Sequence, residues 1–103
     1  MSFRAKMEQA ARSKESNIVL NLDFPFEKPE TRETLFSKAN HVLEAVYPYI
    51  CAVKFNHHLI LPLGTFDGVQ KLVKKAHDFR LMTIMDCKAN DIGSTNQVIA
   101  EYY

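Results

Sequence analysis

The sequence predicts an α/β fold built on a parallel sheet, because strand-like and helix-like segments alternate along it. Three short runs of strand-forming residues, 17–23, 49–55 and 81–88, are each followed by a loop and then by apolar residues at helical spacing. Each run is apolar on both faces until it reaches a charge, which is typical of strands covered on both sides. The 103 residues suffice for one domain of ordinary size.

The composition excludes several classes of protein. Hydrophobic residues make up 47% of the chain and charged residues 24%, as in ordinary globular domains, which excludes a disordered tail and a coiled coil. Because 13 Lys and Arg balance 12 Asp and Glu, we expect neither a nucleic-acid partner nor a membrane partner. No apolar run reaches the roughly 20 residues of a membrane span or forms a secretory signal. Two distant cysteines, Cys51 and Cys87, are expected to be reduced thiols in a cytoplasmic protein.

The elements follow in order from local signals. Residues 1–16 mix charges with apolar residues at helical spacing and predict a short amphipathic helix, with Ser2 as its N-cap. The first strand, 17–23, leads into a proline-marked loop at 24–30. From 31 to 47 one apolar stripe predicts a helix, formed by Leu35, Phe36, Ala39, Val42, Leu43 and Val46.

The same pattern then repeats. After the second strand we expect a loop through His57, His58, Pro62 and Gly64, and then a helix capped by Thr65 or Asp67. The inner stripe of this helix consists of Val69, Leu72, Val73 and Ala76. The third strand follows, and Ser94 and Gln97 have the spacing of a capping box that begins another helix.

Charged residues stand at the carboxyl end of each predicted strand: Asp23, Lys54, and Asp86 with Lys88. Periodicity alone leaves a flavodoxin-like sheet open, but this placement favours a (β/α)8 barrel, whose active site lies at that rim. Asp86 and Lys88 are two residues apart and therefore share a face of the strand. Asp91 follows three residues later, so we expect one site to collect lysines and carboxylates of alternating charge.

Such an array has a chemical use. A lysine between carboxylates keeps its proton and can donate it to a carbon on which negative charge develops. The alternative is a structural network of ion pairs at the strand ends. The recurrence of charge at three successive strand ends favours the functional interpretation.

The segment Asp86-Cys87-Lys88-Ala89-Asn90-Asp91-Ile92 resembles the Asp-x-Lys-x-x-Asp-Ile signature of orotidine 5′-phosphate decarboxylase. Asp23 and Lys54 match the ends of that family's first two strands, and Thr95-Asn96 fits its continuation. The resemblance covers essentially the whole chain. It identifies residues 1–103 as a single partial barrel, with an N-terminal helix at 1–16 and three βα units at 17–103.

The resemblance implies a role for each matching residue. Lys88 would protonate the C6 carbanion left when carbon dioxide departs, and Asp86 would lie beside the departing carboxylate. Lys54 would link the charged array and contact the ribose, and Asp23 would bind a ribose hydroxyl. The resemblance also implies a homodimer, in which Asp91, Ile92 and Thr95 reach across the interface into the site of the other subunit. No cofactor and no metal are implied.

Related sugar-phosphate decarboxylases share the Asp-x-Lys-x-x-Asp motif on the same barrel, but they place an acidic metal ligand at the second strand. Lys54 at that position favours the orotidylate enzyme. Gly93 departs from the proline found in many members of the family and removes no functional group. The adjacent His57 and His58 lack a third ligand close in sequence, so we expect loop histidines that face solvent rather than a metal site.

The length sets a limit on function. A complete (β/α)8 barrel takes about 250 residues, so this chain supplies three strands of eight and lacks the late loops that hold the substrate phosphate in the family. We therefore expect a truncated decarboxylase that is inactive alone. The alternative is a non-catalytic (βα)3 unit that serves assembly or folding. Because three helices can cover only one face of the sheet, we also expect self-association or a complementary barrel fragment.

Overall fold

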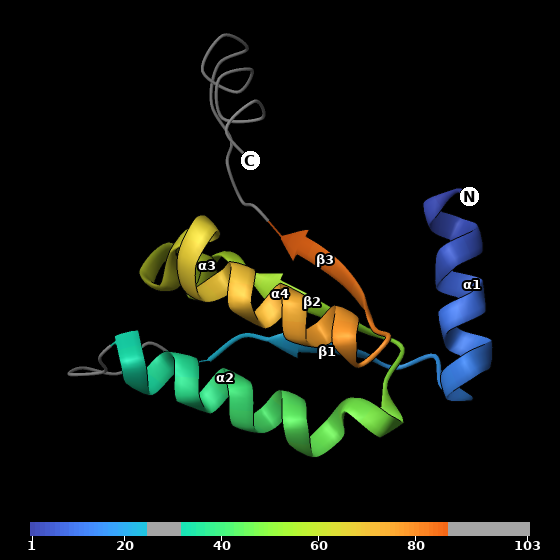
Figure 1. Cartoon of the computed structure of the whole chain (residues 1–103), viewed down its shortest axis with the longest axis horizontal. Helices are drawn as coiled ribbons and strands as arrows, with labels where there is room; N and C mark the ends of the chain where they lie inside the picture. Colours follow the sequence, from blue (N-terminus) through green and yellow to red (C-terminus); the bar gives the residue numbers. More distant parts are fainter. Residues whose placement is uncertain (25–31, 87–103) are drawn as a thin grey trace, which may run out of the picture.

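The computed structural model describes residues 1–24 and 32–86 of the chain. Within these ranges three parallel strands form one sheet, as predicted (Figure 1). Their order in the sheet is β1 (Val19–Leu22), β2 (Ala52–Asn56) and β3 (Met82–Asp86). The register places Leu22 beside Phe55, and Asn56 beside Asp86. β1 and β2 are shorter than the runs that predicted them, 17–23 and 49–55.

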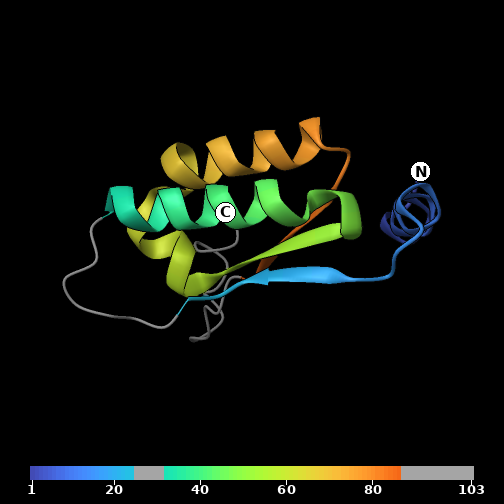
Figure 2. The same ribbon diagram turned by 90° about the horizontal axis from the view of Figure 1, so that it is seen from below.

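Two helices, α2 (Arg32–Val46) and α4 (Val69–Asp78), lie on the same face of the sheet (Figure 2). Each helix returns the chain so that the next strand can pair in parallel. The core forms between this helical layer and the sheet, and its central side chains have no exposed surface: Ala39, Leu43, Val53, Phe55, Leu72 and Ala76. The apolar stripes predicted for both helices therefore face the core, as expected.

The opposite face of the sheet carries the other half of each strand's side chains, because successive residues alternate. On β2, Val53 and Phe55 belong to the core below the helices, so Ala52, Lys54 and Asn56 point to the opposite face. This opposite face is called the open face below, since none of the described helices packs on it (Figure 2).

Helix α1 (Phe3–Lys14) lies beyond the amino ends of the strands, whose arrowheads point away from it (Figure 1). Its N-cap is Ser2, as predicted, and the Ser2 hydroxyl accepts a hydrogen bond of 3.1 Å from the backbone N–H of Ala5. At its other end Lys14 Nζ donates to the carbonyl of Phe79 at 2.7 Å and lies 5.5 Å from the ring centroid of Tyr47. Tyr47, in the 3-10 helix η1 (Tyr47–Tyr49), stacks on Phe79.

The predicted loop through His57, His58, Pro62 and Gly64 is wrong. The chain forms helix α3 (His57–Leu63) and then a π-helical turn, η2 (Gly64–Gly68). Helix forms here because Leu59, Ile60 and Leu63 recur at helical spacing and are almost completely buried, with 2%, 1% and 0% exposed. The burial of three large side chains outweighs the local cost of Pro62 inside the helix.

The predicted cap of α4 is also wrong. Neither Thr65 nor Asp67 caps it, because η2 runs directly into α4 and the residue at the cap position is Gly68, without a side-chain hydrogen bond. A helical turn that precedes α4 leaves its first N–H groups with backbone acceptors, so no polar side chain is required there.

His41 is exposed on α2, and His77 is exposed near the end of α4. The predicted helix from Ser94 and the second cysteine, Cys87, lie outside the described residues. Among residues 1–24 and 32–86, no helix combines the length and the apolar character that crossing a membrane requires.

Candidate active site

Lys54 and Asp86 form an ion pair on the open face. Lys54 Nζ lies 3.6 Å from Asp86 Oδ2, and the two side chains are 34% and 26% exposed. The pair is diagonal, because the register partner of Lys54 is Ile84, two residues before Asp86. Asp86 is the last residue of β3, while Lys54 stands two residues before the end of β2. The structure thus brings together two of the predicted site residues from adjacent strands.

Asn56 is a further polar residue at this edge, which the sequence interpretation did not identify. It ends β2, lies beside Asp86 in the register, and shares the open face with Lys54. With 5% of its surface exposed, it is buried, which is unusual for a polar side chain. Its position two residues after Lys54 is the signal that would have found it, since alternation returns every second side chain to the same face.

Asp23 follows β1 directly and is exposed. Its backbone N–H donates to the carbonyl of Asn21 at 3.0 Å, which closes a three-residue turn. The chain therefore leaves the strand direction at Asp23. The structure places this carboxylate at the carboxyl edge of the sheet, as predicted.

The remaining predicted site residues, Lys88, Asp91, Ile92 and Thr95, lie outside the described residues, so their positions and roles stay predictions. Within the described part of the chain, no three His, Cys, Asp or Glu side chains gather in a way that could hold a metal ion.

The charged edge presents an ammonium group and a carboxylate to the same side of the sheet. Both groups are partly exposed, so a ligand that approaches the open face can reach them. An ammonium group in this position can donate hydrogen bonds to hydroxyls or anions, and the adjacent carboxylate can accept hydrogen bonds from hydroxyls. This combination fits a polar, hydroxylated, anionic ligand.

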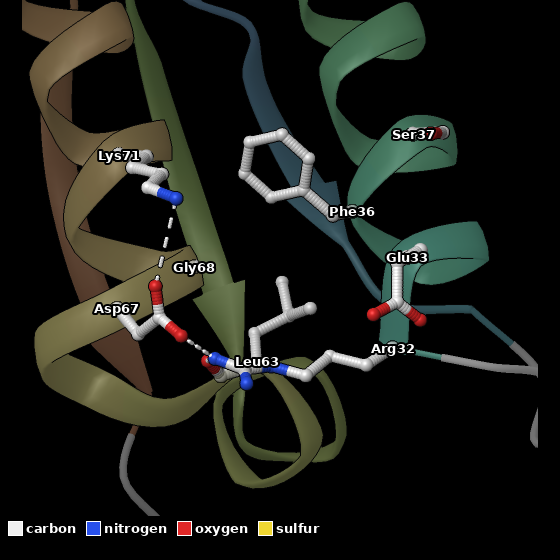
Figure 3. A pocket seen from close by; sticks show the side chains of 8 residues that line it. All are labelled: Arg32, Glu33, Phe36, Ser37, Leu63, Asp67, Gly68 and Lys71. Atoms are coloured by element: carbon white, nitrogen blue, oxygen red, sulfur yellow. Dashed lines mark hydrogen bonds and ion pairs between the residues drawn. The ribbon is translucent and has the colours of Figure 1, made fainter.

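A separate concavity of about 380 Å³ lies between the start of α2 and the η2–α4 junction (Figure 3). None of the predicted site residues lines it. Its charged side chains largely neutralise one another: Arg32 pairs with Asp67, and Lys71 Nζ lies 3.6 Å from the other Asp67 oxygen. Arg32 Nη2 also donates to the carbonyl of Leu63 at 2.8 Å. The hydrogen bond and positive charge of Arg32, assisted by Lys71, lower the pKa of Asp67.

These contacts show that the side chains around the concavity connect helix α2 to α3 and η2. Arg32 is the first residue of α2, and it is joined to the last residue of α3 and to η2. A second connection lies further along the same two helices, where Lys75 of α4 pairs with Glu44 of α2 and donates to Asn40 at 2.6 Å. Both clusters hold the helical layer together, on the face of the sheet opposite to Lys54.

The comparisons with known proteins agree with the geometry. The family model described as "Orotidine 5'-phosphate decarboxylase / HUMPS family" matches residues 16–103. Among solved structures, the chain is similar to a Toxoplasma gondii protein assigned as an orotidine-monophosphate decarboxylase, with 20% sequence identity and a TM-score of 0.69. The match covers 94% of this chain and 35% of the Toxoplasma chain. No curated protein matches the sequence.

The structural likeness establishes the fold as the first βα units of a (β/α)8 barrel, while the sequence model extends over all three units and the charged strand ends. The chain therefore belongs to the orotidine 5′-phosphate decarboxylase / HUMPS family.

Proposed function

We propose that this chain supplies the charged strand ends of an orotidine 5′-phosphate decarboxylase. The observation that carries the proposal is the Lys54–Asp86 pair, 3.6 Å apart on the open face of adjacent parallel strands. Ligands of open α/β sheets and barrels bind at the carboxyl ends of the strands, which is where Asp23, Asn56 and Asp86 lie.

Lys54 favours this activity over the other enzymes that the family model includes. The related sugar-phosphate enzymes place an acidic metal ligand at the end of the second strand, as the resemblance implies. Here the open face of β2 carries an ammonium group and an amide, Lys54 and Asn56. An ammonium group is not a metal ligand while it is protonated, so this strand offers a substrate contact rather than a cation site.

The proposed reaction breaks the bond between C6 of the orotate ring and its carboxylate. The electron pair of that bond stays on C6 as carbon dioxide leaves. Lys88 then donates its proton to C6, which gives uridine monophosphate. Asp86 lies beside the departing carboxylate, while Asp23 and Lys54 hold the ribose. Since an ammonium group supplies the proton, the step uses no cofactor.

The proposed active form is a homodimer in which Asp91, Ile92 and Thr95 reach the site of the other subunit. The chain spans 35% of the Toxoplasma relative, and we propose that the contacts to the substrate phosphate come from residues other than these 103. Contacts remote from the reacting carbon contribute to transition-state binding in such enzymes. We therefore propose that the 103 residues bind the nucleotide weakly and turn it over little or not at all.

Two measurements on the purified chain test these statements separately. Titration with uridine monophosphate, followed by NMR, is expected to shift the signals of Lys54, Asn56 and Asp86 with a dissociation constant in roughly the millimolar range. Lys54→Gln is expected to weaken this binding, whereas Lys75→Gln, on the helical face, serves as the matched control. No shift at the open face would contradict the proposed site.

The second measurement is decarboxylation of orotidine 5′-phosphate by the same preparation. We expect a rate close to that without protein. Robust turnover would show that three βα units suffice for activity and would contradict the proposal that the phosphate contacts are missing.

A further inference from the structure

The two outer edges of the sheet carry complementary hydrogen-bonding groups. Within the described residues, β1 and β3 each pair with β2 on one side only. The backbone N–H of Met82 donates inward, to the carbonyl of Cys51. Since backbone groups alternate along a strand, those of Thr83 and Met85 point outward. On the opposite edge, the carbonyl of Ile18 points inward and accepts a hydrogen bond from the backbone N–H of Cys51. The backbone N–H and carbonyl groups of Val19 and Asn21 therefore point outward.

Within the described strands, β1 and the first four residues of β3 lack the prolines and charges that normally prevent strand addition. β1 reads Val-Leu-Asn-Leu and the first four residues of β3 read Met-Thr-Ile-Met, without a proline or a charge. Charged residues, prolines and bulges are the usual means by which an edge strand avoids pairing with another chain. Each edge instead exposes one large apolar side chain, Val19 with 40% exposed and Met85 with 39%.

We propose that the outer edge of β3 in one copy of this chain pairs in parallel with the outer edge of β1 in a second copy. This surface is called the edge interface below. It does not depend on the proposed decarboxylase function.

A second copy of the chain fits this surface because one sheet contains both halves of the interface. The β1 strand of the second copy presents the outward backbone groups of Val19 and Asn21. These face the outward backbone groups of Thr83 and Met85 in the first copy. Pairing in parallel keeps all helices on one face, so α2 of the second copy lies beside α4 of the first and the helical layer continues. Since the paired segments are uncharged, no like charges oppose each other.

The geometry also predicts the type of assembly. Contact between two different edges is head-to-tail, and each added copy leaves a free β1 or β3 edge at the ends of the assembly. Closed barrels avoid such edges because every strand has two neighbours. The 103-residue chain is therefore expected to form a concentration-dependent series of oligomers rather than a single dimer.

Sedimentation velocity of the purified chain at increasing micromolar concentration tests the proposal. We expect the average mass to rise with concentration. Val19→Lys and Met85→Lys place a charge on the β1 and β3 edges and are each expected to weaken association at least tenfold. Tyr49→Lys is the matched control, since Tyr49 is 69% exposed in η1, outside both strands, and the substitution adds the same charge.

The variants also distinguish the edge interface from packing on the open face. Val19 lies on the open face as well as at an edge, whereas Met85 alternates with Asp86 and lies on the helical face of an edge strand. If only Val19→Lys weakens association, the open face is the interface and the proposal is wrong. If the wild-type chain stays monomeric at all concentrations, the proposal is also wrong.

Hydrogen exchange keeps the test valid if a variant fails to fold. In the wild-type chain, the amides of Val19, Asn21, Thr83 and Met85 are expected to gain protection as concentration rises. Protection of these four amides that is already complete at the lowest concentration would show that the edges are covered within one chain, and it would overturn the proposal.

Discussion

Lys54 on β2 reaches diagonally to Asp86 on the adjacent strand β3, with 3.6 Å between Nζ and Oδ2. The two residues are 32 positions apart in the sequence, and the parallel register places them on the same face of the sheet. A double-mutant cycle with Lys54→Met and Asp86→Asn measures their coupling free energy. Because both groups are partly exposed, we expect about 0.5 kcal/mol from urea unfolding.

The helical pair Arg4–Glu8 is the matched control for that cycle. Its charges are 3.1 Å apart, but the side chains are 90% and 57% exposed. We expect a smaller coupling there, because solvent and salt screen the pair more strongly. Equal coupling free energies for the two pairs would contradict the expectation that partial burial on the open face strengthens the Lys54–Asp86 pair.

Truncation of the core is predicted to be costly at Leu43. This side chain of α2 has no exposed surface and packs in the main cluster. Leu43→Ala is expected to lower the free energy of unfolding by about 2–5 kcal/mol, since it removes buried methyl groups and leaves a cavity. Leu61→Ala, at a side chain that is 65% exposed, is expected to change it by less than about 0.5 kcal/mol.

Gly68 is predicted to resist substitution for a steric reason. A Cβ atom at this position would lie 2.9 Å from Leu63 Cβ and 3.2 Å from the Leu63 carbonyl oxygen. Its φ of −61° is helical, so alanine would gain about 1 kcal/mol from helix propensity. Overpacking against a fully buried leucine costs about 1–3 kcal/mol.

Gly68→Ala is therefore expected to lower the melting temperature in spite of the better helix former. Gln70→Ala, at an exposed position of α4, is the control and should leave the melting temperature unchanged or slightly raised. A more stable Gly68→Ala variant would show that η2 relaxes away from Leu63.

Acid is predicted to weaken the connection between α2 and η2. Arg32 and Lys71 lower the pKa of Asp67 below its ordinary value of 3.8. The folded state therefore binds this proton less readily than the unfolded state. The stabilisation by Asp67 is fully present above its unfolded pKa and is lost as the pH falls through the lower folded pKa.

Urea unfolding as a function of pH checks this direction. Between neutral pH and the acid range, Asp67→Asn is expected to lose less stability than the wild type, because the asparagine does not titrate. Glu44→Gln should behave in the same way, since Lys75 lowers the pKa of Glu44. Parallel pH profiles for wild type and both variants would contradict the prediction.

The sequence predicted the parallel sheet and the buried sides of the helices because both depend on simple periodicities. Alternation of strands and helices indicated a parallel sheet, and the stripe that includes Leu43 indicated the buried side of α2. Helix α3 was missed because Pro62 and Gly64 are common signals of a loop, although Leu59, Ile60 and Leu63 have helical spacing. Tertiary burial of these three side chains decides the local structure.

The site was predicted in part for a similar reason. Charges at strand ends are visible in a sequence, so Asp23, Lys54 and Asp86 were identified. Asn56 was not, because an uncharged amide beside a strand end has no distinct pattern of its own. Its spacing of two residues after Lys54 indicates a shared face of the strand, and the register, which places it beside Asp86, shows that it belongs to the same edge.

Side chains along β2 point alternately to the core and to the open face, so each position on the strand has a fixed environment. Val53 and Phe55 fill the core, and Lys54 and Asn56 face the other side. Deletion of a single residue before Ala52 that moved the strand by one position would turn the ammonium group into the core and a phenyl ring onto the open face. Insertions and deletions in this segment are therefore expected to be far more damaging than substitutions. The spacing along β2 is as much a part of the site as the identity of its residues.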